Sequence, residues 1–86
     1  MKDRQPDHIL KTWPRYFDDV RWGVKRFEVR RDDRGFRVGD LLLLREWNPD
    51  AEEFTGRGAA VEVTYKLDGG AFGVEDGYCV LGVEPR

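Results

Sequence analysis

An 86-residue chain that is 40% hydrophobic and 13% aromatic is too apolar for a disordered segment and too short for more than one core. Charged residues make up 37% of it, and the formal net charge of −2 excludes a uniformly basic protein. We therefore expect a single domain over residues 1–86, with residues 1–7 as a flexible tail.

The charge is distributed unevenly along the chain. Residues 1–37 hold 11 Lys and Arg against 7 Asp and Glu, whereas residues 38–86 hold 4 against 10. This asymmetry favours a positive face that attracts anionic ligands, and pairing of the same charges across strands is an equally good interpretation. The single cysteine, Cys79, lies in an apolar run, which predicts a buried structural thiol in a reducing compartment. No apolar run is long enough for a bilayer, so a cytoplasmic protein is expected.

The first predicted elements are a short strand over residues 8–13 and a short helix. Pro14 suits the first helical position, and Gly23 suits the residue after the last turn, so the helix is expected over residues 14–22. Apolar residues recur along it at helical spacing, which predicts a core-facing stripe. That stripe comprises Trp13, Tyr16, Phe17 and Val20. In so small a core, the three tryptophans are expected to be large contributors.

Four further strands follow in chain order. Residues 27–31 alternate between apolar and polar, residues 41–47 open with four leucines, and residues 61–65 alternate most clearly. Residues 48–58 are expected to form a hairpin-like connection, and the glycine-rich residues 68–77 a loop before a last strand at 78–83. The predicted fold class is α+β, mainly β: a strongly curved five-stranded sheet or barrel with one helix after the first strand.

Residues 23–30 fit the pattern G-x-K-x-x-E-x-R and hold the main candidate site. Glu28 and Arg30 leave the same face of the predicted strand, and Lys25 joins them only if the chain turns at Gly23. An amine, a carboxylate and a guanidinium together indicate a site for a polar or anionic ligand. The alternative is that Glu28 forms ordinary ion pairs on a solvated face.

Other candidates lie outside this segment. Lys11 could add a positive charge from the first strand, and Trp47 and Phe72 are candidate stacking partners for a nucleobase. Phe72 lies in the glycine-rich loop, which could act as a lid and bring Glu75 over the site. His8 is the only histidine and no metal-ligand spacing is present, so neither a metal nor a cofactor is predicted.

These residues resemble a known family. The pattern in residues 23–30 is similar to the signature of ASCH domains, which belong to the PUA-like superfamily, and the surrounding sequence resembles the small single-domain DUF3850 group. The resemblance covers most of residues 8–83. The matching segments are 8–11, 16–18, 27–31, 36–40, 44–47 and 78–82.

The resemblance implies a PUA-like pseudobarrel with a cleft beside the first helix, in which RNA or a nucleotide would bind. One ASCH branch hydrolyses N4-acetylcytidine with a Lys and a Thr from the signature and a later Glu. The Lys corresponds to Lys25, but Glu28 stands where that branch places Thr. The later Glu has only loose counterparts here, Glu62 and Glu75.

The leading functional prediction is a monomeric module that binds RNA or a modified nucleotide through Lys11, Lys25, Glu28 and Arg30, with Trp47 and Phe72 as further contacts. The first alternative is a small amidohydrolase that deacylates N4-acetylcytidine-like nucleosides. In it, Lys25 would be the activated group, and Glu28 or Glu75 would transfer protons. The second alternative is an accessory protein-interaction domain of phage or mobile-element origin.

Overall fold

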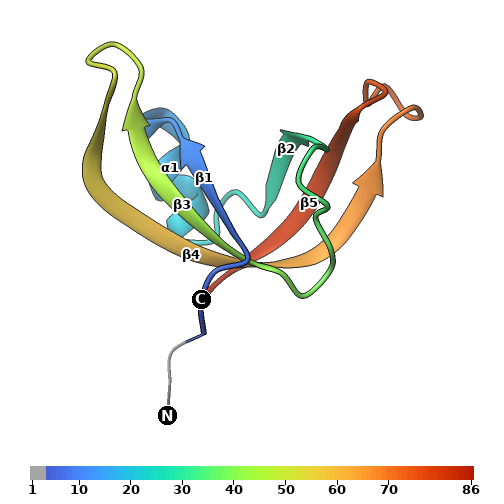
Figure 1. Ribbon diagram of the computed structural model, residues 1–86, viewed down its shortest axis with the longest axis horizontal. Helices are drawn as coiled ribbons and strands as arrows, with labels where there is room; N and C mark the ends of the chain where they lie inside the picture. Colours follow the sequence, from blue (N-terminus) through green and yellow to red (C-terminus); the bar gives the residue numbers. More distant parts are fainter. Residues whose placement is uncertain (1–3) are drawn as a thin grey trace.

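The computed structural model describes residues 4–86 (Figure 1). Its elements are β1 (His8–Thr12), α1 (Pro14–Arg21), β2 (Phe27–Arg31), β3 (Leu41–Asn48), β4 (Glu53–Asp68) and β5 (Tyr78–Pro85). One sheet holds all five strands in the order β1-β3-β4-β5-β2, and only the β1–β3 pair is parallel. The predicted mainly-β fold with one short helix after the first strand is confirmed.

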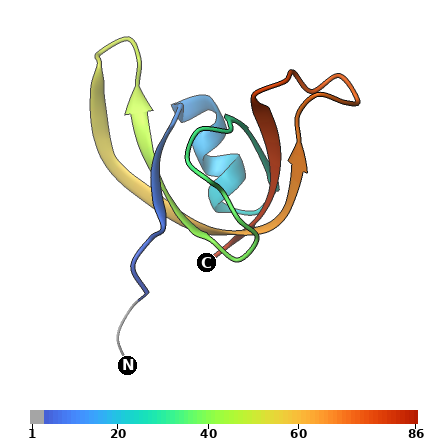
Figure 2. The ribbon, with the colours of Figure 1, turned by 45° about the vertical axis from the view of Figure 1, so that its right-hand side comes forward.

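The sheet curls because β4 takes part in both of its halves. β4 pairs with β3 through its first part and with β5 through its second part, so it forms the base that joins two arms (Figure 1). The register shifts between Val63 and Tyr65, and such bulges bend a strand and increase its twist. Opposite the bulge, a Cβ on Gly82 would lie 2.9 Å from the Thr64 hydroxyl, so the bend requires glycine there. α1 lies inside the resulting half-barrel (Figure 2).

The beginning of β4 differs from the prediction. Residues 53–58 were expected within a connection, but β4 already pairs with β3 from Glu53, which leaves only residues 49–52 in the turn. Both faces of this segment are exposed, so its side chains carry no apolar alternation. Backbone pairing with β3 holds it as a strand, and that pairing leaves no trace in the local sequence pattern.

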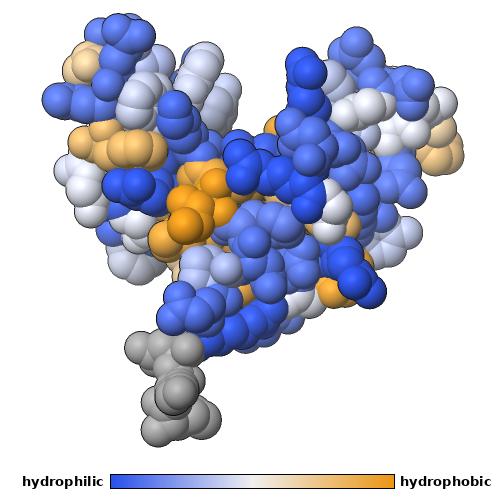
Figure 3. Space-filling view, viewed as in Figure 1, coloured by the Kyte–Doolittle hydropathy of each residue, from blue (hydrophilic) through white to orange (hydrophobic). Residues whose placement is uncertain are grey.

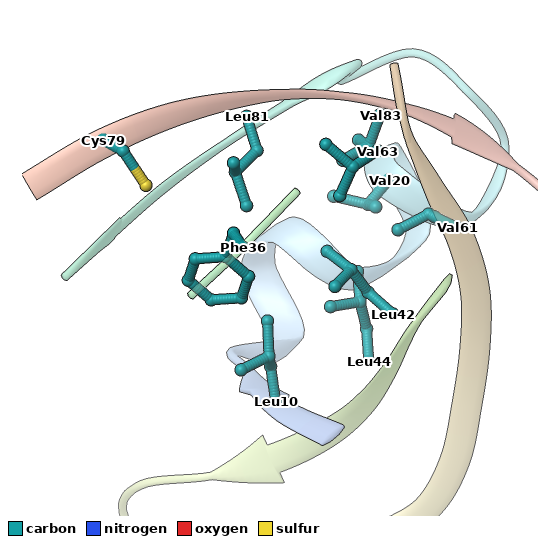
Figure 4. Close-up of a cluster of buried hydrophobic side chains, with 10 residues drawn as sticks. All are labelled: Leu10, Val20, Phe36, Leu42, Leu44, Val61, Val63, Cys79, Leu81 and Val83. Atoms are coloured by element: carbon teal, nitrogen blue, oxygen red, sulfur yellow. The ribbon is translucent and has the colours of Figure 1, made fainter. Parts of the chain in front are cut away.

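The core fills the concave face of the curled sheet (Figure 4). Alternate residues of the strands point inward and meet the side chains of α1 and Phe36. The cluster consists of Leu10, Val20, Phe36, Leu42, Leu44, Val61, Val63, Cys79, Leu81 and Val83. Cys79 is fully buried, as predicted, and its burial raises the pKa of the thiol.

The tryptophans contribute less to this core than predicted. Trp22 is 70% exposed and Trp13 is 52% exposed, and Tyr16 is also exposed. Of the expected helical stripe, only Phe17 and Val20 are buried. The reason is that a two-turn helix resting on β3 and β4 can bury only the narrow stripe that faces them.

The predicted flexible tail, residues 1–7, is only partly described by the structure. Residues 1–3 lie outside the described residues, and at the other end of the segment the amide of Asp7 donates to the Leu41 carbonyl oxygen at 2.8 Å. Over residues 4–86, no helix has the length and apolar character that a membrane crossing requires.

Candidate functional site

The candidate site lies where the two end strands of the sheet, β1 and β2, face each other. We call this place the seam. Arg30 of β2 donates from Nη2 to the Lys11 carbonyl oxygen of β1 at 3.0 Å, and Arg34 donates from Nη1 to the Ile9 carbonyl oxygen at 3.3 Å. β1 and β2 are not neighbours in the strand order. Arginine side chains therefore bridge the seam where a closed barrel would have a backbone ladder.

The free edge of β2 directs main-chain groups into the seam. The Arg26 carbonyl oxygen accepts from the Val83 amide, and hydrogen-bonding direction alternates along an antiparallel strand. Phe27 and Val29 therefore point their N–H and C=O groups away from β5, toward β1. Lys25 Nζ donates to the Phe27 carbonyl oxygen at 2.6 Å. The N–H and C=O of Val29 remain to recognise a ligand.

Glu28 is the centre of the polar cluster in the seam. It is only 4% exposed. Its Oε2 accepts from Lys25 Nζ at 2.7 Å, and its Oε1 accepts from Nε and Nη2 of Arg30 at 3.1 and 2.7 Å. The side chains of Lys25 and Arg30 are 19% and 22% exposed. The three residues converge, and the ion pairs of Glu28 are buried rather than on a solvated face.

The turn at Gly23 brings Lys25 into this cluster. Gly23 has a φ of 76°, a conformation that glycine adopts without strain. The amides of Val24 and Lys25 both donate to the Asp19 carbonyl oxygen, at 2.8 and 2.9 Å, so the chain folds back on the end of α1. Lys25 therefore approaches Glu28 from outside β2. The sequence required this, because in an extended strand Lys25 would point to the face opposite Glu28.

Two pockets lie along the seam, which opens as a hollow between the two arms in the space-filling view (Figure 3). The aromatic pocket has a volume of about 560 Å³ and is lined by Lys11, Thr12, Trp13, Tyr16, Lys25, Phe27, Glu28, Val29 and Arg30. The arginine pocket has a volume of about 440 Å³ and is lined by Ile9, Leu10, Lys11, Arg30, Arg31, Asp33, Arg34, Phe36 and Phe54. Lys11 and Arg30 line both, so the two pockets adjoin at these residues, and we call the two together the groove.

This groove is basic although the chain as a whole is not. Five basic residues line it against two acidic ones, Glu28 and Asp33. Lys11 Nζ lies 3.8 Å from the centroid of the Trp47 ring. Over residues 4–86, no carboxylate lies within salt-bridge distance of that ammonium. Lys11 is therefore a cation held in place by a ring and open to an anion.

Aromatic rings form one wall of the groove. Trp13, Tyr16 and Phe27 line the aromatic pocket and are all exposed. Lys25 Nζ lies 4.7 Å from the Phe27 ring centroid and 5.7 Å from that of Tyr16. Trp13 and Tyr16 were predicted to be core residues, so the sequence analysis missed them as site residues. A two-turn helix cannot bury four large apolar residues, and this limit is the signal that some of them must be exposed.

The remaining predicted site residues lie elsewhere. Trp47 contacts Lys11 and packs edge-to-face on Phe54 at 4.9 Å, but it lines neither pocket. Phe72 is 89% exposed, and Glu75 is exposed too; both lie in the connection between β4 and β5. Neither lines either pocket, so the structure does not bring them to the Glu28 cluster.

A second buried carboxylate, Glu46, was not predicted as a site residue. Arg57 donates to it from Nε and Nη2 at 2.9 and 2.8 Å, and the Thr55 hydroxyl donates at 2.6 Å. These hydrogen bonds, those of Arg57 above all, lower the pKa of Glu46 from 4.5 to about 2. Arg57 also contacts Asp18 of α1 at 3.2 Å, so this network fixes the helix that carries Trp13 and Tyr16. The network positions one wall of the site, although none of its residues lines either pocket.

Metal ligands do not gather anywhere in the part of the chain that the structure describes. Over residues 4–86, no group of three or more His, Cys, Asp and Glu side chains could hold a metal ion. Glu28 and Glu46 each hold an arginine instead. The groove presents cations, aromatic rings and main-chain groups, with Glu28 and Asp33 as its two carboxylates.

Comparison with known proteins places the chain in a family. The domain of unknown function DUF3850 matches residues 7–83, which includes β1 to β4, most of β5 and the whole seam. The chain is also similar to the "Uncharacterized 12.9 kDa protein in GpA 3'region" of Escherichia phage P2, with 42% identity over 61 residues. That match covers 71% of this chain and 54% of the phage protein, so the chain spans about half the length of the relative. With the family match extending over nearly all of the sheet, the chain belongs to the DUF3850 family.

Proposed function

We propose that this protein binds single-stranded RNA or a related nucleotide in the seam between β1 and β2. The observation that carries the proposal is that two adjoining pockets share Lys11 and Arg30, are lined by five basic residues in all, and have exposed rings along one wall. Proteins hold single strands in this way, with cations on the phosphates and rings stacked on the bases. The resemblance to ASCH and PUA-like domains supports the same ligand class.

The charge of the groove can act on a ligand because part of it is not neutralised. Glu28 balances one of the two cations that it contacts, while Lys11 has no carboxylate partner among residues 4–86. An anionic strand entering the groove would replace water around Lys11 rather than break an existing ion pair. Its binding therefore gains charge–charge attraction at little desolvation cost.

Binding should weaken steeply with salt and depend on Lys11. With about three phosphate contacts, the affinity for single-stranded RNA hexamers of A, C or U should fall roughly 20-fold between about 50 and 200 mM salt. Lys11→Ala should lower the affinity roughly 10-fold to 100-fold, since a charge-assisted contact contributes about 1.5–3 kcal/mol. Fluorescence anisotropy of labelled hexamers measures both effects.

Arg37→Ala is the matched control for Lys11→Ala. Arg37 is exposed and lines neither pocket, so its removal changes the net charge equally without touching the groove. It should leave the affinity within about twofold, the range expected for a distant surface charge. Absence of binding to every hexamer at low salt would contradict the proposal.

A second candidate function, hydrolysis of an N4-acylated cytidine, is favoured by one observation. Thr12 lines the aromatic pocket together with Lys25 and Glu28, which supplies the hydroxyl that the signature itself lacks. However, Lys25 and Arg30 engage both oxygens of Glu28. The other candidates, Glu62 and Glu75, line neither pocket. Asp33, the other carboxylate of the groove, lines the arginine pocket and not the aromatic pocket that holds Thr12 and Lys25. The aromatic pocket thus holds a hydroxyl and an amine but no carboxylate free to move a proton.

Incubation with N4-acetylcytidine should therefore produce no cytidine above the rate of a reaction without protein. Chromatography of the nucleosides after prolonged incubation measures this. Release of cytidine that is abolished in both Thr12→Val and Lys25→Met would establish the hydrolase instead. Release that survives Lys25→Met would show that Lys25 is not its catalyst.

A further inference from the structure

We infer that the two pockets take different parts of one ligand: the aromatic pocket takes a nucleobase and the arginine pocket takes backbone phosphate. The ligand is then a single strand of at least two nucleotides rather than a free nucleoside. This inference rests on the proposed function and goes further, because it assigns a substrate class and a direction to the groove.

The aromatic pocket suits a base. Trp13, Tyr16 and Phe27 offer exposed ring faces for stacking. The main-chain N–H and C=O of Val29 face the seam, as the alternation along β2 requires, and can pair with the edge of a base. Glu28 Oε2 accepts only from Lys25, so it retains a lone pair for an exocyclic amine. Glu28 also neutralises part of the positive charge, which makes this pocket a poor place for phosphate.

The arginine pocket is more basic: four cations line it against one carboxylate, Asp33, whereas three cations line the aromatic pocket against Glu28. Arg31 and Arg34 line it, and over residues 4–86 neither has a carboxylate within salt-bridge distance. Arg34 uses only Nη1, on the Ile9 carbonyl oxygen, so its Nε and Nη2 remain for another acceptor. Both guanidinium groups are exposed. A guanidinium with free N–H groups and no acidic partner is suited to phosphate.

The boundary between the pockets determines the minimum length of the ligand. Arg30 crosses the seam to the Lys11 carbonyl oxygen, and both residues line both pockets. A strand with its base among the rings passes over the Lys11 ammonium before it reaches Arg31 and Arg34. One phosphate lies at the boundary and the next in the arginine pocket. A duplex cannot bind in this way, because its bases are stacked and paired.

The test compares nucleosides with strands in the wild-type protein and in four variants. Quenching of tryptophan fluorescence reports binding of adenosine, cytidine and uridine, and anisotropy reports binding of the matching RNA hexamers. Arg31→Ala and Arg34→Ala should each weaken the hexamer about fivefold to tenfold and reduce the salt slope by about 0.7, the value for one phosphate of a single strand. Neither should alter nucleoside binding. Phe27→Ala should weaken nucleoside and hexamer alike, and Arg37→Ala should change neither.

The arginine variants and the duplex test the inference, and hexamer binding to the wild type tests the proposed function. Arg34 also contacts β1, whereas no side-chain hydrogen bond across the seam in residues 4–86 involves Arg31. Arg31→Ala therefore separates loss of phosphate binding from loosening of the fold. If hexamers bind the wild type but both arginine variants keep its affinity and salt slope, the division into pockets is wrong and the proposed function stands. Equal affinity for a duplex of the same sequence would also overturn the inference. If no hexamer binds at all, the proposed function fails first.

Discussion

Glu28→Gln is expected to destabilise the protein by about 3 kcal/mol, one of the two largest effects that the structure predicts. Glu28 is 4% exposed and receives hydrogen bonds from Lys25 and Arg30. Glutamine preserves the shape but removes the charge, so two neighbouring cations remain without a counter-charge. The cost is at the low end for a broken buried ion pair because both cations are partly exposed and can regain water.

Urea denaturation measures this loss, and a fall in melting temperature of more than about 10 °C should accompany it in a domain of this size. Glu84→Gln is the matched control, because Glu84 is exposed on β5 and forms no salt bridge within residues 4–86. The hexamer affinity of Glu28→Gln should fall as well, since Arg30 loses the carboxylate that orients it. A stability within about 0.5 kcal/mol of wild type would show that Glu28 is not the centre of the cluster.

The second large effect is the acid sensitivity that Glu46 confers. Hydrogen bonds from Arg57 and Thr55 lower its pKa in the folded protein to about 2, against an ordinary value of 4.5. Because the folded pKa is the lower one, the unfolded chain takes up the proton first as the pH falls. The stabilisation is therefore complete above about pH 4.5, falls progressively as the pH drops toward 2, and amounts to about 3 kcal/mol at most.

Glu46→Gln should remove this part of the pH dependence. Between about pH 6 and pH 3 the free energy of unfolding of the wild type should fall more steeply than that of the variant. At neutral pH the variant should be about 1–3 kcal/mol less stable, because Arg57 loses its bidentate partner. Urea denaturation across this range measures both quantities, and Glu84→Gln again provides the control. Parallel pH profiles for wild type and Glu46→Gln would contradict the assignment.

Local sequence predicted the parts of the site that are determined locally. The alternation in residues 27–31 places β2 correctly, and Gly23 marks the turn that allows Lys25 to meet Glu28. These features depend on backbone preferences within a few residues, which the sequence expresses directly. Parity predicted that Glu28 and Arg30 share a face, and the turn at Gly23 was the condition for Lys25 to join them.

The rest of the site depends on contacts between distant segments. The Glu46–Arg57 pair joins two strands across a hairpin whose length was underestimated, so its partners were not recognised. Trp13 and Tyr16 follow a helical pattern typical of core residues, but which part of that pattern meets the sheet depends on where α1 docks. The positions of Phe72 and Glu75 depend on the direction of a long connection, which glycine-rich composition does not determine.

The side-chain closure of the seam has a consequence for how the molecule can move. Opening a complete barrel requires that a row of backbone hydrogen bonds break together. Here, three side-chain hydrogen bonds, two from Arg30 and one from Arg34, join β1 to the far end of the sheet. The half-barrel can therefore widen while every strand keeps its ladder partner, and a bulky ligand would replace three side-chain contacts rather than disrupt the sheet.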